Sequence, residues 1–132
     1  MTQIESKSVN VPAEPAKVYA YLSDLRNFKN LLPEDKISDW QAEVDNCQFK
    51  VQGGYKIGLK WHSGQEPDKI ILKSTAASPF PFTLNISMKG DGQSTVTQQI
   101  CDADINPFLK MMVEKPLRNL FDYIADRLVK QF

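Results

Sequence analysis

The sequence predicts one α+β domain in which a curved, seven-stranded antiparallel sheet packs against a long C-terminal helix. Three observations indicate this fold. They are a β-like segment followed by two short helical patterns, a central stretch in which apolar residues recur at every second position, and a final amphipathic segment with helical spacing. A chain of 132 residues is long enough for one core of its own, so residues 1–132 are assigned to a single domain.

The first strand and two short helices are expected before residue 37. Residues 3–11 alternate β-branched and polar side chains, which is typical of a strand. Pro15 suits the first turn of a helix, and apolar residues continue at helical spacing to about residue 23. Ser23 or Asp24 can cap a second short helix, which Pro33 ends. These two helices therefore lie between the first and second strands.

The stretch from residue 37 to 104 fits six further strands. Its apolar residues alternate with polar ones, as in strands that are buried on one face. Turn-forming residues separate these runs, and short turns join adjacent antiparallel strands, so a meander is predicted. The predicted turns are Asp45-Asn46, Gly53-Gly54, Ser63-Gly64, Pro79-Phe80-Pro81 and Gly90-Asp91-Gly92.

The last segment is predicted to be one helix that reaches Phe132. Asn106 can cap it and Pro107 can occupy its first turn. About 26 helical residues would measure roughly 39 Å, enough to cross a whole sheet. Pro116 is expected to interrupt the helix with a kink near residues 112–116, because its ring clashes with the carbonyl of the preceding turn. The apolar stripe of the helix is Leu109, Met112, Val113, Leu117, Leu120, Phe121, Ile124, Ala125 and Leu128.

Charge and cysteine content exclude several classes of function. Sixteen Lys and Arg residues balance sixteen Asp and Glu residues, so no net field attracts phosphate backbones and we expect no nucleic-acid partner. Cys47 and Cys101 lie far apart, and His62 is the only histidine, so neither a disulfide framework nor a metal site is predicted, and no cofactor. No segment approaches the roughly 20 apolar residues that span a bilayer, and residues 1–7 do not resemble a signal peptide. We therefore expect a cytoplasmic protein without stable membrane insertion.

The order of these elements resembles the helix-grip fold of the START, Bet v 1 and polyketide-cyclase-like superfamily over the whole chain. The most specific local match is the strand-to-helix segment of residues 9–24, followed by Phe28 and Leu31-Leu32-Pro33. The resemblance implies that a lipid, sterol, polyketide, quinone or similar compound is held under the long helix. The matching segment is structural, so it assigns no catalytic residue, and the catalytic residues stay unknown.

A ligand site is expected between the sheet and the long helix. A twisted sheet curls, and an amphipathic helix on its concave face leaves a space that is mostly apolar, as small hydrophobic ligands require. A ligand cavity would measure roughly 300 Å³ or more, whereas the same apolar stripes can also simply fill a core. The residues predicted to line the site are Phe49, Ile57, Leu59, Trp61, Leu72, Leu84, Ile86, Met88, Leu109, Met112, Val113, Pro116, Leu117 and Leu120.

Candidate polar anchors come from the first and last strands. Strict alternation from Val9 places Glu5 and Lys7 on the inward face, where a pair could hold a polar group of the ligand. A bulge or an edge position would instead return both charges to water. Thr97 and Gln99 share one face of the last strand and would offer hydrogen bonds to a ligand if that face is inward.

Two other functions stay open beside the binding of a small apolar ligand. An enzyme of the polyketide cyclase or dehydratase kind needs a cluster of titratable groups, which the sequence does not display, and His62 is expected to face solvent. A protein-binding module could use Phe80, Phe82 and Leu31-Leu32-Pro33 as an exposed patch near the pocket mouth. Lysines that share the outer face of the sheet are interpreted as solvated: Lys50, Lys56, Lys60, Lys69 and Lys73.

Overall fold

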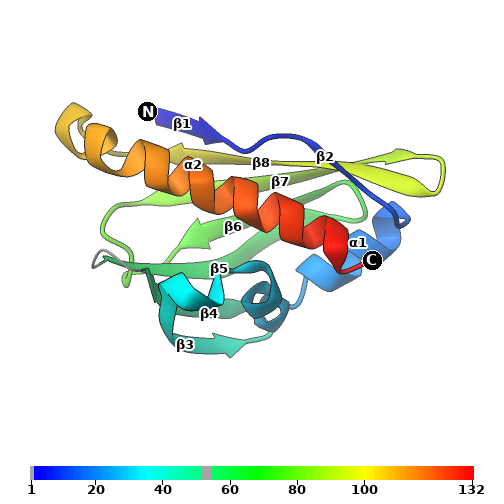
Figure 1. The fold of residues 1–132 in the computed structure, drawn as a ribbon, viewed down its shortest axis with the longest axis horizontal. Coiled ribbons are helices and arrows are strands. Elements are labelled where there is room, and N and C mark those ends of the chain that lie inside the picture. Colours follow the sequence, from blue (N-terminus) through cyan, green and yellow to red (C-terminus); the bar gives the residue numbers. More distant parts are fainter. Residues whose placement is uncertain (1, 52–54) are drawn as a thin grey trace.

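The computed structural model describes residues 2–51 and 55–132, and it confirms the α+β fold with a long C-terminal helix across an antiparallel sheet (Figure 1). In the described residues the elements are, in chain order, β1 (Thr2–Glu5), β2 (Val9–Val11), α1 (Pro15–Leu22), the 3-10 helices η1 (Leu25–Leu31) and η2 (Glu34–Lys36), β3 (Ile37–Glu43), β4 (Asn46–Val51), β5 (Tyr55–Gln65), β6 (Lys69–Ser74), β7 (Phe82–Asp91), β8 (Ser94–Ala103) and α2 (Pro107–Lys130).

The strands form one sheet in the order β1-β8-β7-β6-β5-β4-β3, in which β2 also pairs with β8. All these pairings are antiparallel, and β3 to β8 follow one another as the predicted meander. Because β1 and β2 occupy the same edge beside β8, they are the two halves of the predicted first strand. Figure 1 shows α2 lying across one face of this sheet, with α1 near the C-terminal end of α2.

The first strand is broken at Ser6, and this break reverses the expected orientation of its charged residues. Ser6 is buried, and its side-chain oxygen accepts a hydrogen bond from the backbone N–H of Gln99 at 3.0 Å. Ile4 and Val11 are both fully buried although an uninterrupted strand would turn them to opposite faces. The inward orientation predicted for Glu5 and Lys7 is therefore wrong, and both residues are exposed.

Lys7 instead connects the broken strand to the outside of α2. Its ammonium group lies 2.7 Å from a carboxylate oxygen of Asp126, and its backbone N–H donates to Asp122 at 2.8 Å. The hydrogen bond to Asp126 raises the pKa of Lys7. Lys7 therefore helps to hold the C-terminal half of α2 at the edge of the sheet.

Both short helices predicted after the first strand are present. The first is α1, and the second is η1, which winds as a 3-10 helix. Asp24 caps η1 as predicted, because its carboxylate accepts a hydrogen bond from the backbone N–H of Arg26 at 3.1 Å. The short helix η2 was not predicted. Together α1, η1 and η2 form the connection from β2 to β3.

The cap at Asp24 is expected to make the stability of the domain depend on pH. Its hydrogen bonds with the Arg26 side chain lower the pKa of Asp24 in the folded state. The charged cap therefore stabilises the fold above the pKa of the unfolded chain, and this contribution is lost as pH falls through the folded pKa. We expect Asp24→Ala to lower the free energy of unfolding by about 1 kcal/mol at pH 7 and by much less at pH 2.5. Urea unfolding at both pH values measures the difference, with Asp35→Ala as an exposed control, and an equal loss at both values would contradict it.

The predicted turn at Ser63-Gly64 is wrong, because both residues lie inside β5. The pairing of β5 with β6 shifts between Trp61 and Ser63, so a bulge absorbs the irregularity and the strand continues to Gln65. A side chain at Gly64 would collide with the Tyr19 hydroxyl and lie 2.8 Å from the Trp61 ring. The absence of a side chain at Gly64 therefore allows Tyr19 and Trp61 to approach the strand closely, and Gly64 does not form a turn.

The other predicted turns that fall on described residues lie at or next to observed connections between strands. The connection of β3 to β4 is Val44-Asp45, one residue earlier than predicted. Gly92 has a φ of 68° between β7 and β8, a conformation that glycine adopts easily. Pro79-Phe80-Pro81 lies between β6 and β7 as predicted, and Gly53-Gly54 lies outside the described residues.

The C-terminal helix begins as predicted, because the side-chain oxygen of Asn106 accepts a hydrogen bond from the backbone N–H of Leu109 at 2.8 Å. Pro116 lies within α2 and the helix continues on both sides of it, so the predicted interruption is not a break. The face turned to the sheet is Val113, Leu117, Leu120, Phe121, Ile124, Ala125 and Leu128. No helix in the described part of the chain is both long and apolar enough to span a membrane.

Candidate functional site

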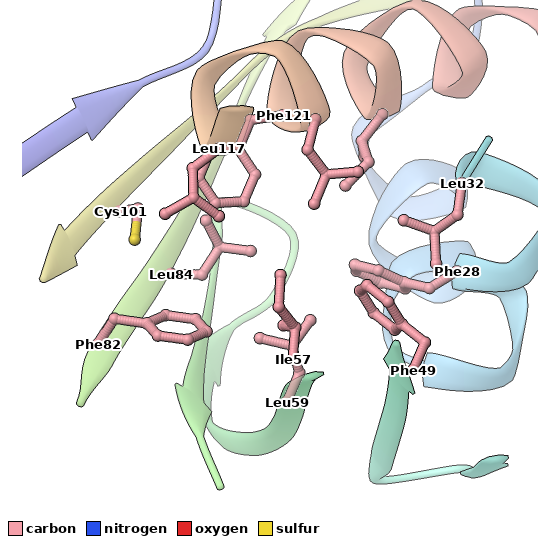
Figure 2. A pocket seen from close by; sticks show the side chains of 12 residues that line it. Phe28, Leu32, Phe49, Ile57, Leu59, Phe82, Leu84, Cys101, Leu117 and Phe121 are labelled. Carbon is pink, nitrogen blue, oxygen red and sulfur yellow. The ribbon is translucent and has the colours of Figure 1, made fainter. Parts of the chain in front are cut away.

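A small closed cavity lies between the sheet and α2 (Figure 2). Its walls come from four strands, from η1 and the residue after it, and from α2. In Figure 2, Leu117 and Phe121 of α2 lie on the opposite side of the space from Phe82 and Leu59 of the sheet. The lining residues are Phe28, Leu32, Phe49, Ile57, Leu59, Phe82, Leu84, Cys101, Leu117, Leu120, Phe121 and Ile124.

The cavity measures about 20 Å³, so the expected volume of roughly 300 Å³ is not found. A space of this size holds about one water molecule. The difference arises because aromatic rings fill the interior, among them Phe28 and Phe49, which are 0% and 2% exposed. The side chains of the protein therefore occupy the space that a small-molecule ligand would need.

A second void of about 10 Å³ lies beside the first, near the C-terminal half of α2. Phe28 and Ile124 line both voids, so these two side chains form the wall between them. Thr97 and Gln99 line the second void and are buried, which confirms that their face of β8 is inward. The interior therefore has a wholly apolar part and a part with two polar side chains.

A hollow on the outside of the protein adjoins the main cavity, the space of about 20 Å³ under α2, at Leu32. This hollow measures about 310 Å³ and is lined by Lys29, Leu32, Glu34, Ile37 and Trp40. Leu32 also lines the main cavity, and Trp40 stacks on the cavity residue Phe49 with ring centroids 6.0 Å apart. Leu32 and the Trp40–Phe49 pair therefore separate the interior from the outer hollow.

Comparison with known proteins identifies the fold. No family model matches the chain, and no curated protein matches its sequence. XoxI from Bacillus cereus has a TM-score of 0.77 at 11% identity, with 100% of this chain and 96% of that chain covered. A START superfamily protein from Mycobacterium smegmatis has a TM-score of 0.70 at 14% identity, with 98% and 99% covered. The chain has a START/Bet v 1-like, helix-grip fold. The KanY protein shares this fold with a TM-score of 0.76 at 19% identity, with 99% and 98% covered.

The helix-grip fold brings together about half of the side chains predicted to line the site. Six of them line the main cavity: Phe49, Ile57, Leu59, Leu84, Leu117 and Leu120. Ile86 lines the second void. Three more belong to the core without lining the main cavity: Leu72, Met88 and Val113. Trp61 and Leu109 are half-buried and pack against the core.

Met112 and Pro116 do not face the site, so their prediction as lining residues is wrong. Successive residues of a helix point about 100° apart, and Val113 faces the sheet. Met112 is consequently turned outward and is 60% exposed, and Pro116 is exposed as well. Phe108 and Met111 share this outward side and are 73% and 84% exposed.

Six residues that line the main cavity were not predicted from the sequence, and Phe28 and Leu32 are the most informative of them. Both come from the connection between β2 and β3, which in the helix-grip fold closes one side of the interior. Their apolar character and the stop at Pro33 were the available signal. The other missed residues are Phe82, Cys101, Phe121 and Ile124.

The patch predicted for a protein partner is not exposed. Phe80 and Phe82 are 7% and 8% exposed and pack against each other with ring centroids 5.8 Å apart. Leu31, Leu32 and Pro33 are also buried. The side chains of Leu31, Leu32, Phe80 and Phe82 are packed in the core, so they offer no surface to a partner. His62 and the outer-face lysines are exposed, as predicted.

The main cavity has no group that is charged at neutral pH among its described lining residues. Cys101 is the one lining side chain that can ionise, and burial raises its pKa to about 12. Burial raises the pKa of Cys47 to about 12 as well. A neutral thiol is a poor nucleophile and a poor base. The described walls of the main cavity are therefore apolar and supply no acid or base for a cyclase or dehydratase reaction.

The Cys101 thiol is expected to report on the opening of the cavity. The variant Cys47→Ser leaves Cys101 as the single thiol. At pH 8 we expect this thiol to react with Ellman's reagent no faster than the fold opens locally. Complete reaction is expected in urea. Absorbance of the released thiolate measures both rates, and Cys101→Ser is the matched control for Cys47. Immediate labelling of folded Cys47→Ser would show instead that the cavity is already open to solvent.

Proposed function

We propose that this protein binds a small apolar molecule between the sheet and α2. The observation that carries the proposal is the wholly apolar lining of the cavity, which Leu32 separates from an outer hollow of about 310 Å³. Displacement of Leu32 and of the Trp40–Phe49 pair would join the two spaces. The resulting chamber would reach the size of small-molecule sites, which begins at roughly 300 Å³.

The attachment of α2 supports a chamber that can widen. In the described part of the chain, the polar contacts that α2 makes with other strands, helices and connecting segments beyond its own cap all involve its C-terminal half, through Phe121, Asp122, Asp126 and Arg127. The N-terminal half makes its ion pairs within the helix, between Glu114 and both Lys110 and Arg118. Apolar contacts hold this half to the sheet, and an apolar ligand can replace such contacts without leaving polar groups unpaired.

A neutral fluorescent probe tests the proposal. We expect N-phenyl-1-naphthylamine to bind with a stoichiometry of one per chain and to increase in fluorescence on binding. Leu84→Phe fills the main cavity and is expected to weaken binding of the probe at least tenfold. Phe108→Ser is the control, because it removes an exposed apolar side chain, and it is expected to change the affinity less than twofold. Circular dichroism checks that both variants are folded.

Two outcomes would contradict the proposal. Absence of saturable binding to the wild-type protein would show that the chamber does not open. Loss of binding in Phe108→Ser but not in Leu84→Phe would place the probe on the exposed side of α2. A separate measurement addresses the natural ligand. Native mass spectrometry of the protein from its own cell extract, followed by denaturation, identifies the class of any bound compound.

A further inference from the structure

The side chain of Gln99 presents an unused hydrogen-bond acceptor inside the protein. Gln99 lies on the inward face of β8 and is 4% exposed. Its backbone is satisfied by Ser6, which accepts from the Gln99 N–H at 3.0 Å and donates to the Gln99 carbonyl at 2.9 Å. Its Nε2 donates to the backbone carbonyl of Phe121 at 3.2 Å. Its Oε1 has no hydrogen-bond partner among the described residues.

The chemistry of the neighbouring group decides the orientation of this amide. The Phe121 oxygen is a carbonyl and can only accept, so the Gln99 group that faces it must be the NH₂. A flipped amide would set two carbonyl oxygens against each other and leave the NH₂ without a partner. The free atom is therefore Oε1, a neutral acceptor with two lone pairs. A buried acceptor without a partner is unfavourable, so a donor supplied from outside the chain would stabilise the fold.

The position of Gln99 relative to the proposed chamber connects this acceptor to a ligand. Gln99 lines the second void with Thr97, and Phe28 and Ile124 separate this void from the main cavity. In the closed form the void of about 10 Å³ has room for at most a single water molecule. A shift of Phe28 would join the two voids and bring a molecule in the apolar part within reach of Oε1.

The charges around both voids restrict the group that can bind there. In the described part of the chain, no Lys, Arg or His lines either void, so a carboxylate or phosphate would be buried without a counter-charge beside a carbonyl oxygen that repels it. No Asp or Glu lines them either, so an ammonium group would also lack its counter-charge. A neutral hydroxyl or N–H satisfies Oε1 without either penalty.

We propose that the ligand of this protein is an uncharged apolar molecule with a hydroxyl or N–H group, which donates a hydrogen bond to Oε1 of Gln99. This inference rests on the proposed function and adds the chemical class of the ligand to it. Ionised fatty acids, phosphate esters and protonated amines are excluded as ligands. Neutral phenols, alcohols and indole-like compounds are of the expected class.

Indole and indene test this inference, because the two bicyclic molecules have nearly the same shape and differ in the N–H group. Isothermal titration of the wild-type protein is expected to show indole binding at least tenfold more tightly than indene. In Gln99→Leu the preference is expected to fall below twofold, while indene still binds. Gln98→Leu is the matched control, since it makes the same change at the neighbouring residue on the other face of β8, and it is expected to keep the preference.

A measurement on the wild-type protein does not depend on the folding of a variant. The side-chain amide signals of Gln99 in a ¹H–¹⁵N spectrum are expected to move more with indole than with indene. Equal binding of both probes would overturn the donor inference and leave the proposed binding function intact. Binding of neither probe would overturn the chamber itself, and the donor inference with it.

Discussion

Phe28→Ala is expected to lower the free energy of unfolding by about 3–5 kcal/mol, a large share of the stability of a domain of this size. Phe28 is fully buried in η1 and lines both internal voids. Removal of its ring costs the free energy of transfer and also leaves a cavity that the surrounding sheet and helix cannot close completely. Urea unfolding followed by circular dichroism measures the loss.

The same variant is expected to bind a small apolar molecule more tightly than the wild-type protein. Without the Phe28 ring the two voids become one space, and an apolar cavity made in this way takes up benzene. Benzene at about 100 times its dissociation constant would restore roughly 2.7 kcal/mol of stability. Phe108→Ala is the matched control, because that phenylalanine is 73% exposed, and we expect a change within about 0.5 kcal/mol and no effect of benzene. Similar losses in the two variants would contradict the packing of η1 into the core.

The fold could be predicted because its main elements depend on local patterns. Period-two alternation indicated the strands from β3 to β8, and the cap at Asn106 with the apolar stripe after it indicated α2. The break at Ser6 could not be predicted in the same way, because Ser6 is buried through hydrogen bonds with Gln99, a residue far away in the sequence. That break moved Glu5 and Lys7 to the surface.

The site was predicted in part for the same reason. Strand residues such as Phe49, Leu59 and Leu84 line the cavity because alternation decides which face they occupy. Phe28 and Leu32 were missed because a short helical segment does not reveal which part of the sheet it covers. The volume depends on how these rings and the side chains of α2 interlock, and no local pattern encodes it.

Leu117→Asp is expected to be the most damaging single change on α2, with a loss of about 3–5 kcal/mol or more at pH 7.5. Leu117 is 3% exposed and lines the main cavity, where the described lining residues offer no positive charge to a carboxylate. Burial raises the pKa of a carboxyl group in such a place above its value in the unfolded chain. Protonation therefore favours the folded variant, and the loss is expected to grow as pH rises from 4 to 7.5.

Met111→Asp makes the corresponding change on the outward side of the same helix. Met111 is 84% exposed, so its replacement is expected to alter the free energy of unfolding by no more than about 0.5 kcal/mol at either pH. Urea unfolding of both variants at pH 4 and pH 7.5 provides the comparison. A loss in Leu117→Asp that stays small and does not depend on pH would mean that water already reaches this part of the interior. The space under α2 would then be a hydrated cleft, and its affinity for apolar molecules would lose its physical basis, since a ligand gains little by replacing well-hydrogen-bonded water.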